Sequence, residues 1–155
     1  QMTIDWIPGI TTLRGEFIQG QQPGTSSTSV SPSAQPTTDT YIRNFNGGYV
    51  YFLQNIWTTK YQLAVKYDWY DPNTDVAGND IGKSVTTPLG KTFAKTGKQD
   101  IVYTTLGLGL VYRLDTNVKL TAYYDIVNNE TSQNLAGYTK DIKDNVFTLR
   151  VQYKF

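Results

Sequence analysis

Apolar and polar residues alternate strictly at the C-terminal end of this chain. Over residues 145–155 the apolar positions are Phe147, Leu149, Val151, Tyr153 and Phe155, and the polar ones between them are Thr148, Arg150, Gln152 and Lys154. Successive side chains of a β-strand point to opposite faces, so this period of two predicts a strand with one apolar and one polar face. The stretch matches the roughly 9–11 residues of a tilted strand that crosses a bilayer.

The same alternation predicts a series of strands along the chain. Their approximate bounds are 11–20, 47–57, 60–71, 101–114, 117–127 and 145–155, and residues 2–6 are predicted to end an earlier strand. The stretch 47–57 has two candidate apolar faces, Tyr49, Tyr51 and Leu53 or Val50, Phe52 and Ile56. We favour the tyrosine face.

The connections between these strands alternate in length. Short ones lie at 7–10, 57–60 and 115–117, and long ones rich in Ser, Thr, Pro, Gly, Asn and Asp lie at 21–46, 71–100 and 128–144. Transmembrane β-barrels have this organisation, with short periplasmic turns and long extracellular loops. A soluble barrel or sandwich also has alternating strands, but loops beyond roughly 12–15 residues are uncommon in compact soluble domains.

The fold that these patterns predict is all-β, an antiparallel up-and-down transmembrane β-barrel. About eight strands are the practical minimum for closing a barrel, so the predicted strands must be completed by others. The chain begins at Gln1 without a Met start, and we expect residues 1–155 to be the C-terminal part of one larger outer-membrane barrel domain. The missing strands would come from an upstream segment or from another chain.

Aromatic composition fits a membrane-facing sheet. The chain has 12 Tyr, 3 Trp and 6 Phe. Trp57 and Tyr61 at one end of strand 60–71, with Tyr67 and Trp69 at the other end, predict two girdles at membrane interfaces. The expected partner is therefore outer-membrane lipid. The 14 basic and 13 acidic residues nearly cancel, so no nucleic-acid partner is expected.

Catalytic and metal-binding chemistry has little support in the sequence. Some outer-membrane barrels are phospholipases or proteases that depend on a histidine, and the chain has none, so we expect neither an enzyme nor a cofactor. Oxygen ligands between Asp71 and Asp80 are similar to a calcium loop, but Val76 and Gly82 stand where Gly and a bidentate Glu are needed. Asx turns explain this loop better, and no metal site is expected.

Gly107 and Gly109 interrupt the polar face of the strand at 101–114. Glycine inside a strand costs about 0.5–1 kcal/mol relative to alanine, so a compensating contact is needed. Such glycines often mark the close approach of another backbone or of a bulky group. We therefore expect an aromatic ring, with Tyr103 and Tyr123 available, or a folded-in loop to cover the pair.

Two features resemble known outer-membrane proteins. The last strand, with Tyr153 and Phe155 at its end, resembles the C-terminal signal by which the barrel-assembly machinery recognises its clients, and this implies that machinery as a partner. Residues 66–74, 107–112 and 119–125 resemble the closing strands of the phosphate-selective porin O and P family, particularly its Bacteroidota members. The resemblance implies a Gram-negative outer-membrane barrel of some sixteen strands, often trimeric, that passes small anions or other small solutes.

The polar faces of the predicted strands supply the candidate pore lining. These residues are Arg14, Glu16, Lys66, Asp68, Lys119, Asp125, Arg150 and Lys154. They would form either a basic ladder that selects anions or a mixed wall in which acidic and basic side chains pair. The expected function is a porin, a passive diffusion channel for small hydrophilic solutes, with anion or phosphate preference left open. The alternative is a barrel that serves as a scaffold or client subunit of a larger outer-membrane complex.

Overall fold

The computed structural model describes residues 2–4, 9–25, 39–57 and 60–155. The strands are β1 (Met2–Ile4), β2 (Thr11–Gly24), β3 (Tyr41–Asn55), β4 (Tyr61–Asp71), β5 (Ser84–Thr86), β6 (Thr92–Ala94), β7 (Tyr103–Arg113), β8 (Val118–Asn129) and β9 (Val146–Tyr153). Two short 3-10 helices, η1 (Gly78–Asp80) and η2 (Lys98–Asp100), lie between β4 and β7. Within the described ranges, no helix is long and apolar enough to cross a membrane.

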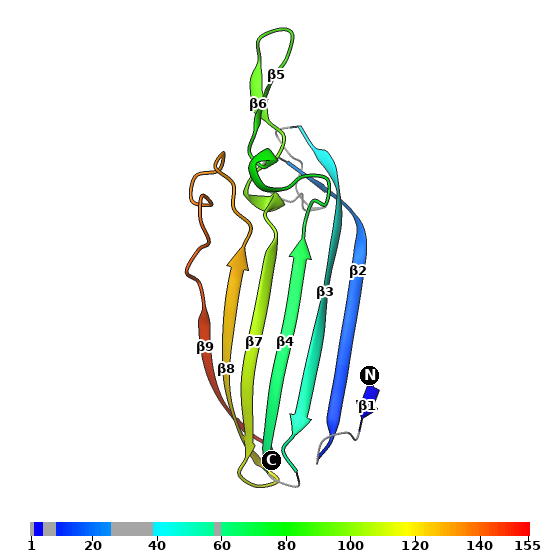
Figure 1. Cartoon of the computed structure of the whole chain (residues 1–155), viewed down its shortest axis with the longest axis vertical. Coiled ribbons are helices and arrows are strands. Elements are labelled where there is room, and N and C mark those ends of the chain that lie inside the picture. Colours follow the sequence, from blue (N-terminus) through cyan, green and yellow to red (C-terminus); the bar gives the residue numbers. More distant parts are fainter. Residues whose placement is uncertain (1, 5–8, 26–38, 58–59) are drawn as a thin grey trace.

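One antiparallel sheet contains β1, β2, β3, β4, β7, β8 and β9 in that order, so its strands pair in the order of the chain. The remaining two strands, β5 and β6, form a hairpin that rises beyond the sheet (Figure 1). The predicted all-β, antiparallel, up-and-down architecture is confirmed for this part of the chain. The strand ends that short connections join lie at one end of the sheet, and those that long connections join lie at the other, as the loop lengths predicted (Figure 1).

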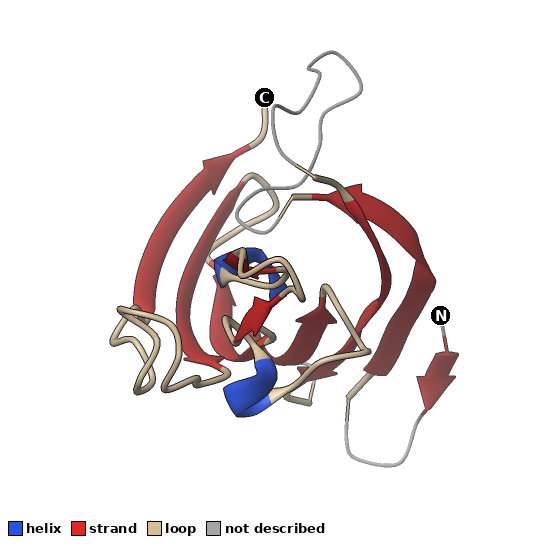
Figure 2. Ribbon diagram, turned by 90° about the horizontal axis from the view of Figure 1, so that it is seen from above, coloured by secondary structure: helices blue, strands red, loops and turns tan. Residues whose placement is uncertain are grey.

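The sheet is strongly curved. Seen from above, its strands follow an open arc with β1 and β9 at the two edges, and the connection between β4 and β7 lies over the hollow of the arc (Figure 2). Residues of β3, β4, β8 and β9 line a common hollow, although these strands are not all neighbours in the sheet. Curvature therefore gives the sheet an inner, concave face and an outer face.

The strand register assigns side chains to these two faces, because residues paired directly across an antiparallel ladder point the same way. One row across the sheet contains Arg14, Tyr51, Lys66, Gly107, Asp125 and Val146. The adjacent row contains Gly15, Val50, Tyr67, Leu106 and Ile126. The first row includes residues of the hollow and is therefore on the inner face, whereas the second faces outward.

The prediction that Tyr49 and Tyr51 lie on the apolar face of the stretch 47–57 is wrong. The register pairs Val50 with Tyr67, Phe52 with Val65, Tyr49 with Asp68 and Tyr51 with Lys66. Val50 and Phe52 therefore lie on the outer, apolar face, and the two tyrosines lie on the inner, polar one. Tyrosine suits either face, because its ring is apolar and its hydroxyl can form hydrogen bonds, so it does not fix the phase of a strand.

β2 and β3 are longer than the sequence predicted. Their ladder continues to the pair Gly24 and Tyr41, within the predicted loop 21–46. Along this extension the outer face carries mostly amides, Gln19, Gln21, Asn44 and Asn46, with Ile42 as an isolated aliphatic residue. The apolar alternation that reveals the other strands is therefore missing, although pairing continues. The part of that predicted loop at 26–38 lies outside the described residues.

Few apolar side chains are buried. Among the described residues, the buried hydrophobic ones are Ala64, Ile81 and Ile101, and both isoleucines lie in the connection between β4 and β7. On the outer face of β9, Leu149 and Val151 are 69% and 68% exposed. No described element packs over that face. This is not the arrangement of a soluble sandwich, in which apolar faces of two sheets pack against each other.

Side-chain hydrogen bonds shape the turns. The Asp115 carboxylate accepts bonds from the backbone N–H groups of Asn117 and Val118 at 2.7 and 2.8 Å, which closes the predicted tight turn between β7 and β8. These two bonds hold the pKa of Asp115 below its ordinary value. Asp71 and Asn73 each accept a bond from the backbone N–H group two residues further on, which confirms the expected Asx turns after β4.

Candidate functional site

The predicted pore-lining residues share the inner face of the sheet. Register places Arg14 and Glu16 of β2, Lys66 and Asp68 of β4, Lys119 and Asp125 of β8, and Arg150 of β9 on this face. Lys154 follows β9, and its backbone N–H donates to the carbonyl of Asn117 at 2.9 Å, which continues the same alternation. Residues from distant parts of the sequence therefore line one concave surface, which we call the inner wall.

One basic and one acidic candidate form an ion pair. Lys66 Nζ lies 2.7 Å from a carboxylate oxygen of Asp68, and the two side chains are 35% and 31% exposed. The residues lie two positions apart on one face of β4, so each neutralises the other. This pair fits the alternative of a mixed wall, in which acidic and basic side chains pair. Among the described residues, the other candidates form no ion pair.

The charge of the inner wall changes along its length: acidic and basic residues share rows toward the long connections, and only basic ones lie at the short-turn end of β7, β8 and β9. The acidic residues Glu16, Asp68 and Asp125 lie in rows nearer the long connections. The short-turn end of β7, β8 and β9 carries four cations, Arg113, Lys119, Arg150 and Lys154, with no acidic residue on the inner face there. The candidates chosen from the sequence left out Arg113, which pairs with Lys119 at the end of β7.

An aromatic ring covers the glycine pair of β7. A Cβ atom added at Gly107 would collide with Oη, Cε1 and Cζ of Tyr123, and one added at Gly109 would collide with Cδ2 and Cε2. Opposite edges of the ring therefore approach the two glycines, so the ring lies flat across β7. The predicted aromatic cover is confirmed, and Tyr123 supplies it.

Beside this ring the inner wall forms a hollow of about 360 Å³. It is lined by Tyr51, Lys66, Thr121, Tyr123, Asp125, Thr148 and Arg150. Ala64 of β4 lies next to Gly109 on the inner face and is only 2% exposed. The candidates Lys66, Asp125 and Arg150 are brought together here with hydroxyl groups that the sequence did not single out.

A buried ion pair ties the connection between β4 and β7 to the inner wall. Arg43 of β3 and Asp100 of η2 are 3% and 0% exposed, and Arg43 Nε donates to Asp100 Oδ1 at 2.5 Å. Asn73 and Gly97 donate to the same carboxylate at 2.7 Å each. Arg43 also donates to the carbonyl of Thr25 at 2.7 Å. The pair therefore holds this connection over the hollow of the arc, toward β2 and β3 (Figure 2).

This ion pair was not predicted from the sequence. Arg43 falls in the stretch predicted as loop 21–46, and Asp100 lies at the far end of the next long loop. The position of Arg43 could have been predicted from the alternation of β3. Arg43 is an even number of residues from Phe45 and Tyr49, so it lies on the same inner face once β3 is extended to Tyr41.

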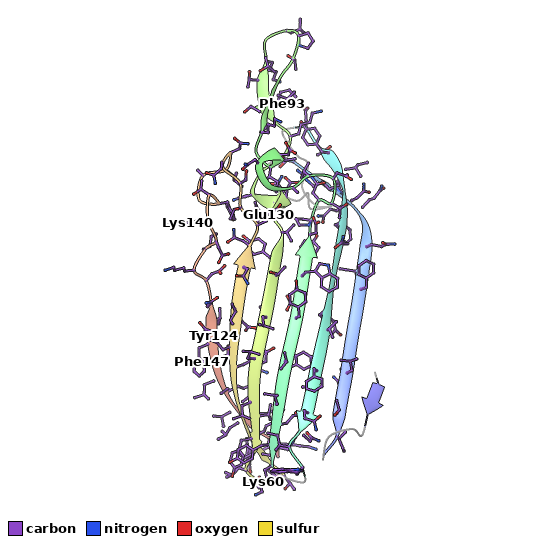
Figure 3. All side chains as sticks on the ribbon, in the orientation of Figure 1. Lys60, Phe93, Tyr124, Glu130, Lys140 and Phe147 are labelled. Atoms are coloured by element: carbon purple, nitrogen blue, oxygen red, sulfur yellow. The ribbon has the colours of Figure 1, made fainter. Side chains whose placement is uncertain are left out.

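The long connections also bind one another at the same end of the sheet. Glu130, labelled in Figure 3, accepts a bond from the backbone N–H of Gly78 at 2.6 Å. Ser132 Oγ donates to the carbonyl of Ile81 at 2.7 Å, and both residues are fully buried. The connections that follow β4 and β8 are therefore joined by hydrogen bonds into one cap.

The outer face forms an apolar belt with distinct borders. Its aliphatic members include Leu63, Val65, Leu106, Leu108, Leu110, Leu120, Leu149 and Val151. At the short-turn end, the rings of Tyr61 and Tyr112 stack with centroids 4.8 Å apart. Toward the long connections, Trp69 donates to Asn46 at 3.1 Å, at the start of the amide-bearing extension of β2 and β3. Between these borders, Tyr124 and Phe147 pair across β8 and β9 (Figure 3).

Comparison of the chain with protein-family models, with curated proteins and with solved structures finds no match.

Proposed function

We propose that this chain is a wall segment of an outer-membrane β-barrel that acts as a porin, with the apolar belt against lipid and the inner wall against water. The observation that carries the proposal is a single curved sheet whose uncovered outer face is apolar and whose concave face is charged. In water, an exposed apolar surface of this extent would be unfavourable. In a bilayer, the same surface is the one that lipid requires.

The dimensions of the belt support a lipid partner. β4 has 11 residues and β8 has 12, within or near the roughly 9–11 residues that a tilted strand needs to cross the hydrocarbon core. Tyrosine and tryptophan rings lie at the borders of the belt, where amphipathic rings are favoured in membranes. Beyond the border near Trp69, the outer face changes to amides, which suit the polar headgroup region.

The arc needs further strands to close. Strand edges do not occur exposed to lipid, because unpaired backbone groups there cost several kcal/mol each. β1 and β9 form the edges of the described sheet, and we infer that other strands of the full barrel pair with both. The resemblance to phosphate-selective porins implies about sixteen strands, often in a trimer, and the exposed Tyr153 and Phe155 would serve as the assembly signal.

Solute passage is the role that the inner wall supports best. A wall with charges and hydroxyl groups suits small hydrophilic solutes. The basic side chains at its short-turn end favour the passage of anions over that of cations. The Lys66–Asp68 pair makes the middle of the wall less basic than the sequence alone suggests. We therefore infer a moderate anion preference that arises near the short turns.

Single-channel recording tests this function. The full-length protein in a planar bilayer should give ohmic conductance steps, and asymmetric KCl should give a reversal potential on the anion side. Replacing both Lys119 and Arg150 with glutamine should move that potential toward zero, because two of the four cations are lost. Absence of conductance from correctly folded protein would favour the alternative, a scaffold or client subunit of a larger complex.

A further inference from the structure

The Tyr123 ring presents one face to the hollow of the inner wall. Its other face lies on the backbone of Gly107 and Gly109, since opposite ring edges approach the two glycines. A side chain larger than hydrogen at either position would lift the ring off the strand. The glycines therefore make a flat aromatic platform at the floor of a hollow of about 360 Å³. That volume is at the lower end of the roughly 300–1,000 Å³ range of ligand sites.

The groups around this platform carry both charges and hydroxyls. Asp125 lies on β8 two residues beyond Tyr123, toward the long connections, and Arg150 lies on the opposite side, paired with Thr121. Neither forms an ion pair among the described residues, whereas Lys66 is bound to Asp68. The hollow therefore offers one free carboxylate and one free guanidinium.

Hydroxyl groups complete the lining. Tyr51 faces the hollow from β3, and Thr121 and Thr148 face it from β8 and β9. A hydroxyl can both donate and accept, a carboxylate only accepts, and a guanidinium only donates. The site thus has every kind of partner that a hydroxyl-rich ligand needs, and its opposed charges give no strong preference for an anion.

We propose that this hollow is a binding station for a small neutral carbohydrate, which stacks on Tyr123 and is held by Asp125 and Arg150. The assignment rests on the proposed function, because it requires the inner wall to face a solute pathway. The electron-rich face of an aromatic ring attracts the polarised C–H groups on one side of a sugar ring. Hydroxyls at the edge of that sugar ring can donate to the carboxylate and accept from the guanidinium, and charged partners give the stronger hydrogen bonds.

A phosphate ion fits this hollow less well. A dianion would be repelled by the free Asp125 carboxylate, and the cation nearest that carboxylate in the register, Lys66, is already neutralised by Asp68. It would also leave the aromatic platform unused. Three of the four cations at the short-turn end lie outside the hollow, so Arg150 alone is shared between the anion preference and the carbohydrate site.

Current block by a sugar tests the station. Maltotriose is titrated against the ion current of the full-length protein in a planar bilayer, with inorganic phosphate as the comparison. We expect maltotriose to interrupt the current, and Tyr123→Ala to raise the half-blocking concentration about fivefold, as loss of an aromatic contact of roughly 1 kcal/mol predicts. Asp125→Asn should raise it as well. Tyr124→Ala changes the next residue, on the outer face, and should leave the block unaltered.

Several results would rule out the carbohydrate-binding site while leaving the proposed porin function intact. These are an open wild-type channel that maltotriose does not block, a channel that phosphate blocks and maltotriose does not, and a block that Asp125→Asn leaves unchanged. The last result remains decisive even where Tyr123→Ala fails to fold. A wild-type protein that inserts and never conducts would instead count against the proposed function itself.

Discussion

At the scale of single residues, neighbouring positions on β9 should respond oppositely to charge. Leu149 is 69% exposed on the outer face, whereas Thr148 lines the hollow on the inner face. Leu149→Arg should lower the free energy of unfolding by about 2–4 kcal/mol, because an arginine on the lipid side of a barrel near the bilayer midplane costs that much. Reversible guanidinium unfolding of the full-length protein in lipid vesicles measures the change.

Thr148→Arg is the matched control. It adds the same side chain one position away, on the polar wall, and should cost far less. Equal losses for the two variants would mean that the outer face of β9 does not meet lipid.

Residue type alone predicted the contact made at some positions but did not determine the face on which others lie. Gly107 and Gly109 predicted a covering ring or loop, and the Tyr123 ring covers them, because the cost of a bare strand backbone is a local property. Tyr49 and Tyr51 were assigned to the wrong face, since a tyrosine fits an apolar or a polar environment. Only the pairing with Lys66 and Asp68 decides their side.

At the scale of elements, the buried pair of Arg43 and Asp100 should decide where the connection between β4 and β7 lies. Asp100→Asn would leave the Arg43 charge buried without its counterion, and losing one partner of a buried pair typically costs about 3–5 kcal/mol. We expect the connection to detach while the sheet stays folded. Trypsin should then cleave after Lys95 and Lys98 several times faster than in the wild type, as mass spectrometry of the fragments would report.

An exposed ion pair in the same connection provides the control. Lys83 and Asp80 lie 3.4 Å apart and are 67% and 69% exposed, so Asp80→Asn should leave the cleavage rate nearly unchanged. If Asp100→Asn and Asp80→Asn were cleaved at the same rate as the wild type, the buried pair would not be what holds the connection in place.

The strands were predictable to the extent that their outer face is apolar. β4, β7, β8 and β9 were predicted to within a few residues, because aliphatic and polar positions alternate along their length. The ends of β2 and β3 were missed where Gln and Asn occupy the outer face. The Arg43–Asp100 pair was missed for a further reason: it joins two elements through the fold, and no local pattern links residues so far apart.

At the scale of the whole molecule, the separation of short turns and long connections predicts an orientation. In outer-membrane barrels the long loops face the cell exterior. An epitope inserted after Gly90, in the turn of the β5–β6 hairpin, should be stained on intact cells, and one inserted at Thr116 in the short turn should not. Flow cytometry measures both, with permeabilised cells as the control for expression. Staining of intact cells at Thr116 would invert the orientation.

The glycine pair under Tyr123 also has a consequence for how the sheet reaches its correct alignment. A shift of β8 against β7 by one residue would move the apolar side chains of β8 to the inner face and its polar ones to the outer face. The alternation of apolar and polar residues therefore disfavours this shift. A shift by two residues keeps every side chain on its proper face, so that pattern does not oppose it. Such a shift would slide the Tyr123 ring partly onto Thr105 or Val111, whose side chains occupy the space that Gly107 and Gly109 leave free. The bare backbone of β7 therefore accommodates the Tyr123 ring in one register only. It disfavours two-residue register shifts, which the alternation of apolar and polar residues does not oppose.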